Sequence, residues 1–181
     1  MKIIICNYQW VFNPYIRESF LKFIGKEIQD CILVIDECHN IIDVATEVNS
    51  ERISPYSLRL CLKDMEMYRS SQGMQNFVNF LIKYLNKQKS RLRENEVGLN
   101  PEDFLNTLLK RLGMKDLNEL KNLIIEMHEF SAAIHQEKMD MGEISRDYVG
   151  SLAEFWLKWL RTYMLPNYFF CYTVRRVKGN K

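Results

Sequence analysis

The sequence has no long hydrophobic run and few residues that break secondary structure. No apolar stretch in its 181 residues approaches the roughly 20 residues that a helix needs to cross a bilayer. The first residues, MKIIICNYQW, lack the length of a signal peptide. Only 7 glycines and 4 prolines argue against disorder and against a turn-rich all-β protein. We therefore expect a soluble intracellular protein without a membrane partner, cytoplasmic or nucleoid-associated, or nuclear if the source is eukaryotic.

Neither the cysteines nor the net charge assigns a function. The chain has 5 cysteines, at positions 6, 31, 38, 61 and 171, and none is paired at metal-ligand spacing. The sequence therefore predicts neither a disulfide framework nor a zinc or iron–sulfur site within this chain. Lys and Arg number 25 against 23 Asp and Glu, a net charge of +2. A nucleic acid would therefore have to bind a local basic patch.

A phosphate-binding loop is also missing from the sequence. In many nucleotide hydrolases, the motif GxxxxGK[ST] supplies the backbone amides and the lysine that hold the phosphates. None of the 7 glycines begins this motif. A complete site for phosphoryl transfer therefore cannot be built from this sequence by the usual loop.

What the sequence does contain first is a short α/β pattern. Residues 2–6 (KIIIC) and 31–36 (CILVID) are continuous apolar runs rich in β-branched residues, typical of buried parallel strands. Between them, Asn13-Pro14 opens a segment with helical spacing of apolar residues that ends near Gly25. Two strands joined by a helix predict a βαβ unit with a parallel sheet.

The rest of the sequence predicts helices and one closing strand. Ser54-Pro55 and Asn100-Pro101 each place a capping residue before a proline at the first helical position. Apolar residues then recur at three- and four-residue steps. The predicted helices cover 54–70, 74–93, 100–112, 116–138 and 148–163. The aromatic run NYFFCYTVRRV, which begins at residue 167, predicts a strand.

The expected fold class is α+β, mostly α, in three parts. Residues 1–45 would form a small parallel α/β piece, 46–166 a helical domain, and 167–181 a strand that returns toward the first part. The first part is too small to cover both faces of a sheet by itself.

The candidate catalytic side chains lie in the stretch LVIDECHN, residues 33–40. A carboxylate just past the end of a buried parallel strand lies at the ligand-binding edge of an α/β sheet. Asp36 could hold a magnesium ion through its water shell, and Glu37 could deprotonate the water that attacks a γ-phosphate. The plainer interpretation is a strand that happens to end in two carboxylates near a helix cap.

The full string resembles the DEAH-type Walker B box of superfamily 2 helicases, with Cys38 in place of alanine. Upstream, residues 7–17 (NYQWVFNPYIR) resemble the NYxxLxDPxIR stretch that precedes this box in the XPD family of iron–sulfur DNA helicases. In that family, a mostly helical Arch domain follows the box and returns to the RecA-like motor through an aromatic segment similar to residues 167–170.

The resemblance implies a set of roles. Asp36 would coordinate magnesium, Glu37 would be the catalytic base for ATP, and His39 would couple nucleotide state to the motor. An iron–sulfur cluster is expected in the parent enzyme, with its ligands outside this chain. The implied partners are single-stranded DNA, the rest of the motor and proteins of DNA repair, such as nucleotide excision repair. The chain alone is expected to be inactive.

Candidate DNA contacts come from the resembling motif and from one basic cluster. The motif supplies Tyr8, Tyr15 and Arg17, and the cluster supplies Arg175, Arg176 and Lys178. Basic side chains bind phosphates, and aromatic rings stack on single-stranded bases. A different class of function stays open, in which a non-enzymatic helical module retains a relic box and binds other proteins.

Overall fold

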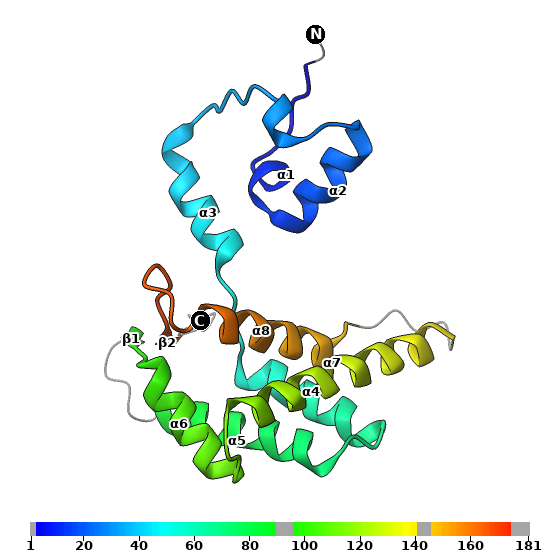
Figure 1. Ribbon diagram of the computed structural model, residues 1–181, viewed down its shortest axis with the longest axis vertical. Helices are drawn as coiled ribbons and strands as arrows, with labels where there is room; N and C mark the ends of the chain where they lie inside the picture. Colours follow the sequence, from blue (N-terminus) through cyan, green and yellow to red (C-terminus); the bar gives the residue numbers. More distant parts are fainter. Residues whose placement is uncertain (1–2, 90–95, 141–145, 175–181) are drawn as a thin grey trace, which may run out of the picture. The chain divides into compact units, whose positions relative to one another are not determined.

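The computed structural model describes residues 3–89, 96–140 and 146–174 (Figure 1). Its contacts divide the chain into two compact units, Met1–Glu51 and Arg52–Lys181. The class is α+β and mostly α, as expected from the sequence. The proposed boundary at residue 45 lies within α3 (Ile41–Asn49), and Phe170, from the proposed returning strand, packs on the core of the second unit.

The N-terminal unit consists of short helices. They are α1 (Gln9–Phe12), α2 (Pro14–Ile24), the 3-10 helices η1 (Ile28–Asp30) and η2 (Cys38–Asn40), and α3. Helix α2 begins where Asn13-Pro14 predicts it, because a proline in the first turn gives up only an amide that would lack a partner. The Asn13 side chain accepts a hydrogen bond from the Ile16 amide at 3.3 Å. Gly25 follows the helix with φ of 65°, a left-handed conformation open to glycine.

The two strands predicted for this unit do not form. Residues 3–6 and 31–35 have no regular secondary structure, and no backbone hydrogen bond joins them in the described part of the chain. Ile5, Ile32 and Val34 expose 95%, 92% and 91% of their area. A parallel strand needs a neighbour at its edges and cover on both faces. The predicted parallel pair is therefore wrong for these residues, because the described residues supply neither.

The second unit is a helical bundle with a small sheet. Its helices are α4 (Pro55–Met67), α5 (Gln72–Lys89), α6 (Pro101–Leu112), α7 (Leu117–Asp140) and α8 (Tyr148–Thr162). Both predicted caps are present. The Ser54 hydroxyl accepts from the Ser57 amide at 3.1 Å, and the Asn100 side chain accepts from the next two free amides of α6. These bonds satisfy amides that have no partner inside the helix.

The sheet of the second unit pairs β1 (Glu96–Gly98) with β2 (Cys171–Thr173) in antiparallel register. The β2 strand confirms the predicted closing strand over part of its length, whereas β1 was not predicted. Opposite Val97, Tyr172 donates a hydrogen bond from its hydroxyl to the Tyr84 hydroxyl at 3.1 Å. Burial, followed by the bond to Tyr84, raises the pKa of Tyr172. The phenol therefore stays protonated, and its hydrogen bond to Tyr84 ties the sheet to α5.

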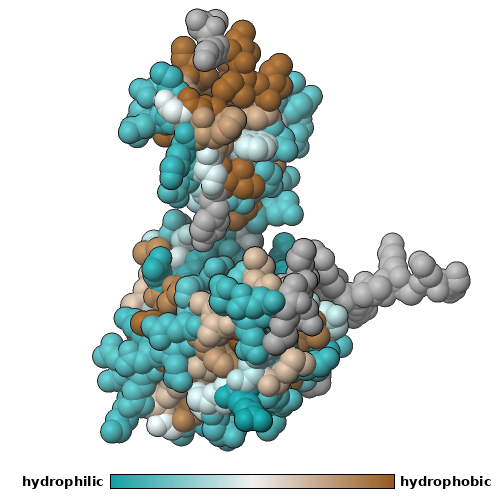
Figure 2. Space-filling view, turned by 90° about the vertical axis from the view of Figure 1, so that its right-hand side faces the viewer, coloured by the Kyte–Doolittle hydropathy of each residue, from teal (hydrophilic) through white to brown (hydrophobic). Residues whose placement is uncertain are grey.

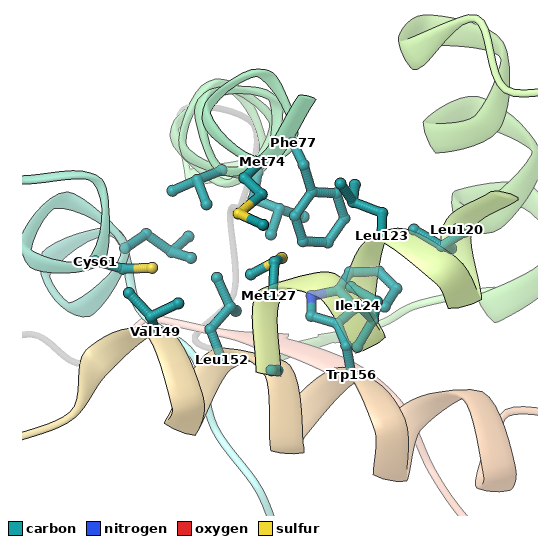
Figure 3. Close-up of a cluster of buried hydrophobic side chains, with 14 of the residues drawn as sticks. Cys61, Met74, Phe77, Leu120, Leu123, Ile124, Met127, Val149, Leu152 and Trp156 are labelled. Carbon is teal, nitrogen blue, oxygen red and sulfur yellow. The ribbon is translucent and has the colours of Figure 1, made fainter. Parts of the chain in front are cut away.

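The core of the second unit takes side chains from all of α4–α8, and Figure 3 shows the part that lies between α4, α5, α7 and α8. Its largest buried side chain, Trp156 on α8, meets Phe77 of α5 edge-to-face with ring centroids 5.2 Å apart. Trp159 contacts Phe170 in the same way at 5.5 Å. Such aromatic pairs contribute about 0.5–1.5 kcal/mol beyond the area that they bury. The contact of Trp159 with Phe170 holds the aromatic segment before β2 against α8.

A buried charge pair connects two helices of this bundle. Lys138 near the end of α7 contacts Asp64 of α4 with 3.1 Å between Nζ and Oδ2. Their side chains expose only 10% and 17% of their area. The same ammonium lies 5.6 Å from the ring centroid of Tyr68. The pair fixes the relation of α4 to α7, because either charge left alone at such burial would be costly.

The junction between α7 and α8 requires a glycine. Asp147 caps α8 by accepting from the Gly150 amide at 2.7 Å, and its other oxygen accepts from the buried Ser131 hydroxyl of α7 at 2.5 Å. A β-carbon at position 150 would lie 2.1 Å from Asp147 Oδ2 and 2.5 Å from Ser131 Oγ. Any larger residue would therefore displace the capping carboxylate.

Replacing Gly150 by alanine tests this junction. We expect Gly150→Ala to lower the free energy of unfolding by about 1–3 kcal/mol, because the new methyl group expels the cap of α8. Gly73→Ala on α5 is the matched control, since its β-carbon would meet Leu123 Cδ1 at an ordinary 3.6 Å. The control should be neutral or stabilising by up to about 1 kcal/mol. Equal urea midpoints for the two variants would contradict the account.

Candidate functional site

The DECH box lies on a tight turn between residues 31–35 and α3. Glu37 is the N-cap of η2 and has φ of 51° and ψ of 43°, the left-handed region. A non-glycine residue in this region costs about 1–2 kcal/mol. The Asp36 side chain accepts from the Glu37 amide at 3.0 Å, and the Glu37 carbonyl accepts from the Asn40 amide at 3.0 Å. The turn sets the direction in which the two carboxylates leave the backbone.

Tyr8 contacts this turn from the NYQWVFNPYIR motif. Its hydroxyl donates to the Asp36 carbonyl oxygen and lies 3.0 Å from the Glu37 carbonyl oxygen. Desolvation, and then the charges of Asp36 and Glu37, raise the pKa of Tyr8. The phenol therefore stays protonated and remains a donor at neutral pH. The motif and the box, separated by α2 in the sequence, are joined at this point.

Glu37 also meets His39. The distance from Glu37 Oε2 to His39 Nδ1 is 3.2 Å, and the two side chains expose 66% and 71% of their area. An exposed pair of this kind is weak because water and salt screen it. The structure thus brings two of the predicted catalytic residues together, yet leaves the Glu37 carboxylate accessible to water.

An apolar hollow adjoins the box. Its volume is about 570 Å³, and residues 3–8 and 32–37 line it from two sides, together with Val11 and Phe12. Asp36 and Glu37 are the acidic members of this lining. The brown side chains beside the grey first residues in Figure 2 belong to the same apolar region. The box is therefore presented at the edge of an uncovered apolar surface.

The predicted DNA contacts fall in different places. Arg17 donates from Nη1 to the Val11 carbonyl at 3.4 Å, so it links α2 to the end of α1. Tyr15 lies in α2, but its side chain is outside the description. Arg175, Arg176 and Lys178 lie outside the described residues. None of the six is tested as a DNA contact by this structure.

The donor set at the box suits magnesium better than a transition metal. Among the described residues, no group of three or more His, Cys, Asp and Glu side chains is placed to hold a metal ion. Zinc usually takes three or four ligands from the protein. Magnesium keeps several water ligands and usually takes only one or two carboxylates from the protein. Asp36, an exposed carboxylate, fits that mode of binding.

Comparison with known proteins matches the same segment. The family model named DEAD_2 matches residues 1–58. ATP-dependent DNA helicase CHL1 of Vanderwaltozyma polyspora is 29% identical over 131 residues, which cover 65% of this chain and 15% of that protein. Residues 1–58 thus match the model of an XPD-like DNA helicase family, and this relative supports a fragment of such a helicase.

Two other relatives of this helicase family extend the comparison. The ATP-dependent DNA helicase chl-1 of Caenorhabditis elegans is 24% identical over 140 residues, 77% of this chain and 16% of that protein. The CHL1 helicase of Kluyveromyces lactis is 36% identical over 67 residues, 37% of this chain and 8% of that protein. The chain thus spans about a sixth or less of the length of these relatives. The two longer matches exceed the 51 residues of the N-terminal unit and so include part of the helical unit.

Two features of this helicase-family site had no signal in the residue pattern. The left-handed conformation of Glu37 is uncommon for a residue with a β-carbon, so nothing in DECH predicts it. The contact of Tyr8 with the box is long-range, and Tyr8 was singled out only as a DNA contact.

Within the described part of the chain, no helix is both long and apolar enough to cross a membrane.

Proposed function

We propose that this chain supplies the Walker B carboxylates and a helical Arch-like domain to an ATP-dependent DNA helicase of XPD type. The observation that carries the proposal is the order of the NYQWVFNPYIR motif and the DECH box within residues 1–58, the segment that matches DEAD_2. The relatives, named as ATP-dependent DNA helicases, support the same activity for the complete protein.

In this proposal the two carboxylates have separate tasks. Asp36 would hold magnesium through its water shell, and the bound ion would supply positive charge to the phosphates. Glu37 orients and deprotonates the attacking water, a task for which its exposed carboxylate is suited. His39 lies against Glu37 and is the residue through which a change at the nucleotide would reach η2 and α3.

The other half of the nucleotide site must come from another segment. The sequence of this chain holds no GxxxxGK[ST] loop, so the phosphates have no cradle here. The uncovered apolar residues 3–5 and 32–35 would receive the neighbouring strands of the motor. The iron–sulfur cluster of the parent enzyme would likewise be held by residues outside this chain. We expect no ATP hydrolysis by the chain alone.

The helical unit would guide single-stranded DNA, with Arg175, Arg176 and Lys178 as the proposed contacts near its C-terminal end. Tyr8, Tyr15 and Arg17 are the proposed contacts on the N-terminal unit. The complete enzyme would act on DNA in the nucleus or nucleoid, in repair, and together with repair proteins.

One observation favours a second candidate function, a non-enzymatic interaction module. On the helical unit, Val97, Met164 and Phe169 expose 40%, 68% and 76% of their area. Large apolar side chains exposed in this way would contribute to a contact with another protein. If this function holds, the box is a relic and Glu37 can be replaced without effect.

Exchange into a relative tests the proposed role of Glu37. Residues 1–58 would replace the matched segment of the K. lactis CHL1 helicase, which supplies the rest of its own protein. We expect magnesium-ATP hydrolysis by this chimera, and a loss of at least about 100-fold in kcat on Glu37→Gln, because the general base is removed. Glu47→Gln on α3 is the matched control and should retain activity.

The isolated chain provides the complementary measurement. We expect no magnesium-ATP hydrolysis above that of its Glu37→Gln variant, with or without single-stranded DNA. A DNA-stimulated rate that Glu37→Gln removes would contradict the expected inactivity. A chimera that hydrolyses ATP equally well with Glu37→Gln would instead favour the interaction module.

The proposed DNA contacts are tested by the salt dependence of binding. Each phosphate contact that is lost should lower the slope of log K against log salt by about 0.7 for a single strand. Arg175→Gln with Arg176→Gln should therefore reduce the slope by about 1.4 in fluorescence anisotropy. The matched control, Lys110→Gln with Arg111→Gln, removes two exposed cations from α6 and should leave the slope unchanged. Equal slopes for both pairs would rule out the C-terminal cluster as a contact.

A further inference from the structure

The Tyr8 hydroxyl contacts the backbone of the box itself. It donates to the carbonyl of Asp36, 28 residues later in the sequence, and lies 3.0 Å from the carbonyl of Glu37. The other hydrogen bonds of this turn are local. Glu37 bonds to its neighbour Asp36, and Asn40 bonds back to Glu37. Tyr8 therefore makes the long-range contact that distinguishes this turn from an isolated peptide.

The turn needs such a contact because of Glu37. Its φ of 51° is unfavourable for a residue with a β-carbon, so surrounding structure must hold it. Local hydrogen bonds can form in an isolated peptide and do not by themselves select this conformation. A tyrosine hydroxyl that donates to the Asp36 carbonyl and lies 3.0 Å from the Glu37 carbonyl contacts both peptide groups that flank the Glu37 α-carbon, and so constrains its φ and ψ.

We propose that Tyr8 is a positioning residue that holds Glu37 in the left-handed turn and so aims its carboxylate. This inference rests on the proposed role of Glu37 as the general base. Tyr8 itself touches neither nucleotide nor water in this role. It acts through the backbone of the box, which is a different task from the DNA contact that the sequence motif suggested.

The surroundings of Tyr8 keep it suited to this task. The charged or titratable groups that act on it are Asp36, Glu37 and Cys38, and together with desolvation they raise its pKa. The phenol therefore remains a donor across the physiological range. Its ring also packs near Phe12, with centroids 6.3 Å apart. Tyr8→Phe keeps this ring contact and removes only the donor.

Nuclear magnetic resonance of the 181-residue chain tests the inference without any nucleotide. In Tyr8→Phe, the HN–Hα coupling and the Cα shift of Glu37 should leave the values of a left-handed residue. The Asn40 amide should exchange about fivefold faster, the loss of one ordinary hydrogen bond. Tyr56→Phe is the control, since Tyr56 is 65% exposed on α4 and should change neither. Unchanged Glu37 parameters in Tyr8→Phe would overturn the proposal.

Two further measurements separate positioning from simple packing. In a Glu37→Gly background, Tyr8→Phe should change the Asn40 exchange rate much less, because glycine reaches the left-handed region unaided. Replacing Tyr8 by 4-aminophenylalanine keeps the ring and restores a donor at its para position, so the Glu37 coupling and Cα shift should keep the values of a left-handed residue. Loss of those values in this variant would overturn the proposal, even if Tyr8→Phe unfolded the unit.

Different results would contradict the positioning role of Tyr8 and the proposed function. In the chimera with the K. lactis helicase, Tyr8→Phe should lower kcat while leaving the KM for ATP unchanged. If the Glu37 turn responds to Tyr8 as expected but Glu37→Gln leaves hydrolysis intact, the proposed base is wrong and the contact is real. If Glu37→Gln removes activity while the turn ignores Tyr8→Phe, the base stands and the positioning role is wrong.

Discussion

The N-terminal unit depends on one constraint: the backbone groups of residues 3–6 and 31–35 need strand partners, and they have none within the described residues. Both segments carry apolar side chains at consecutive positions, so either face of a strand built from them would be apolar. Such segments are stable when strands lie at their edges and helices cover both faces. The described residues provide neither, and Ile5 and Ile32 stand almost fully exposed. The position of the DECH box, which follows Ile35, therefore also depends on strand partners for the segment before it.

The helical unit needs no partner from outside, because its own helices bury their apolar faces. Helices satisfy their own backbone groups, so α4–α8 need only bury their apolar faces against one another. Trp156 and Phe77 fill the centre of that core, and Lys138 with Asp64 ties α7 to α4. Figure 1 shows α7 and α8 side by side, which agrees with their joint contact at Asp147 and Ser131. One chain thus contains a unit that closes its own core and one that does not.

This difference explains which predictions from the sequence were correct. Helix starts at Pro55 and Pro101 follow from local chemistry, because a cap and a proline act within one turn. The strands at 2–6 and 31–36 were inferred from composition that suits a buried sheet, but strand formation needs partners that local sequence cannot supply. Strand β1 was missed for the same reason, since Glu96–Gly98 pairs with residues more than 70 positions away. At the site, the motif singled out Asp36, Glu37 and His39, and their roles stay predictions, whereas the Tyr8 contact required the fold.

Amide hydrogen exchange of the chain in solution tests the central claim that residues 3–6 and 32–35 have no strand partners within this chain. The amides of residues 3–6 and 32–35 should exchange at rates near those of an unstructured peptide, while those of Phe77, Met127 and Trp156 stay protected. Strong protection of 3–6 and 32–35 in a monomer would contradict the account, because these residues would then have built a paired sheet from this chain alone.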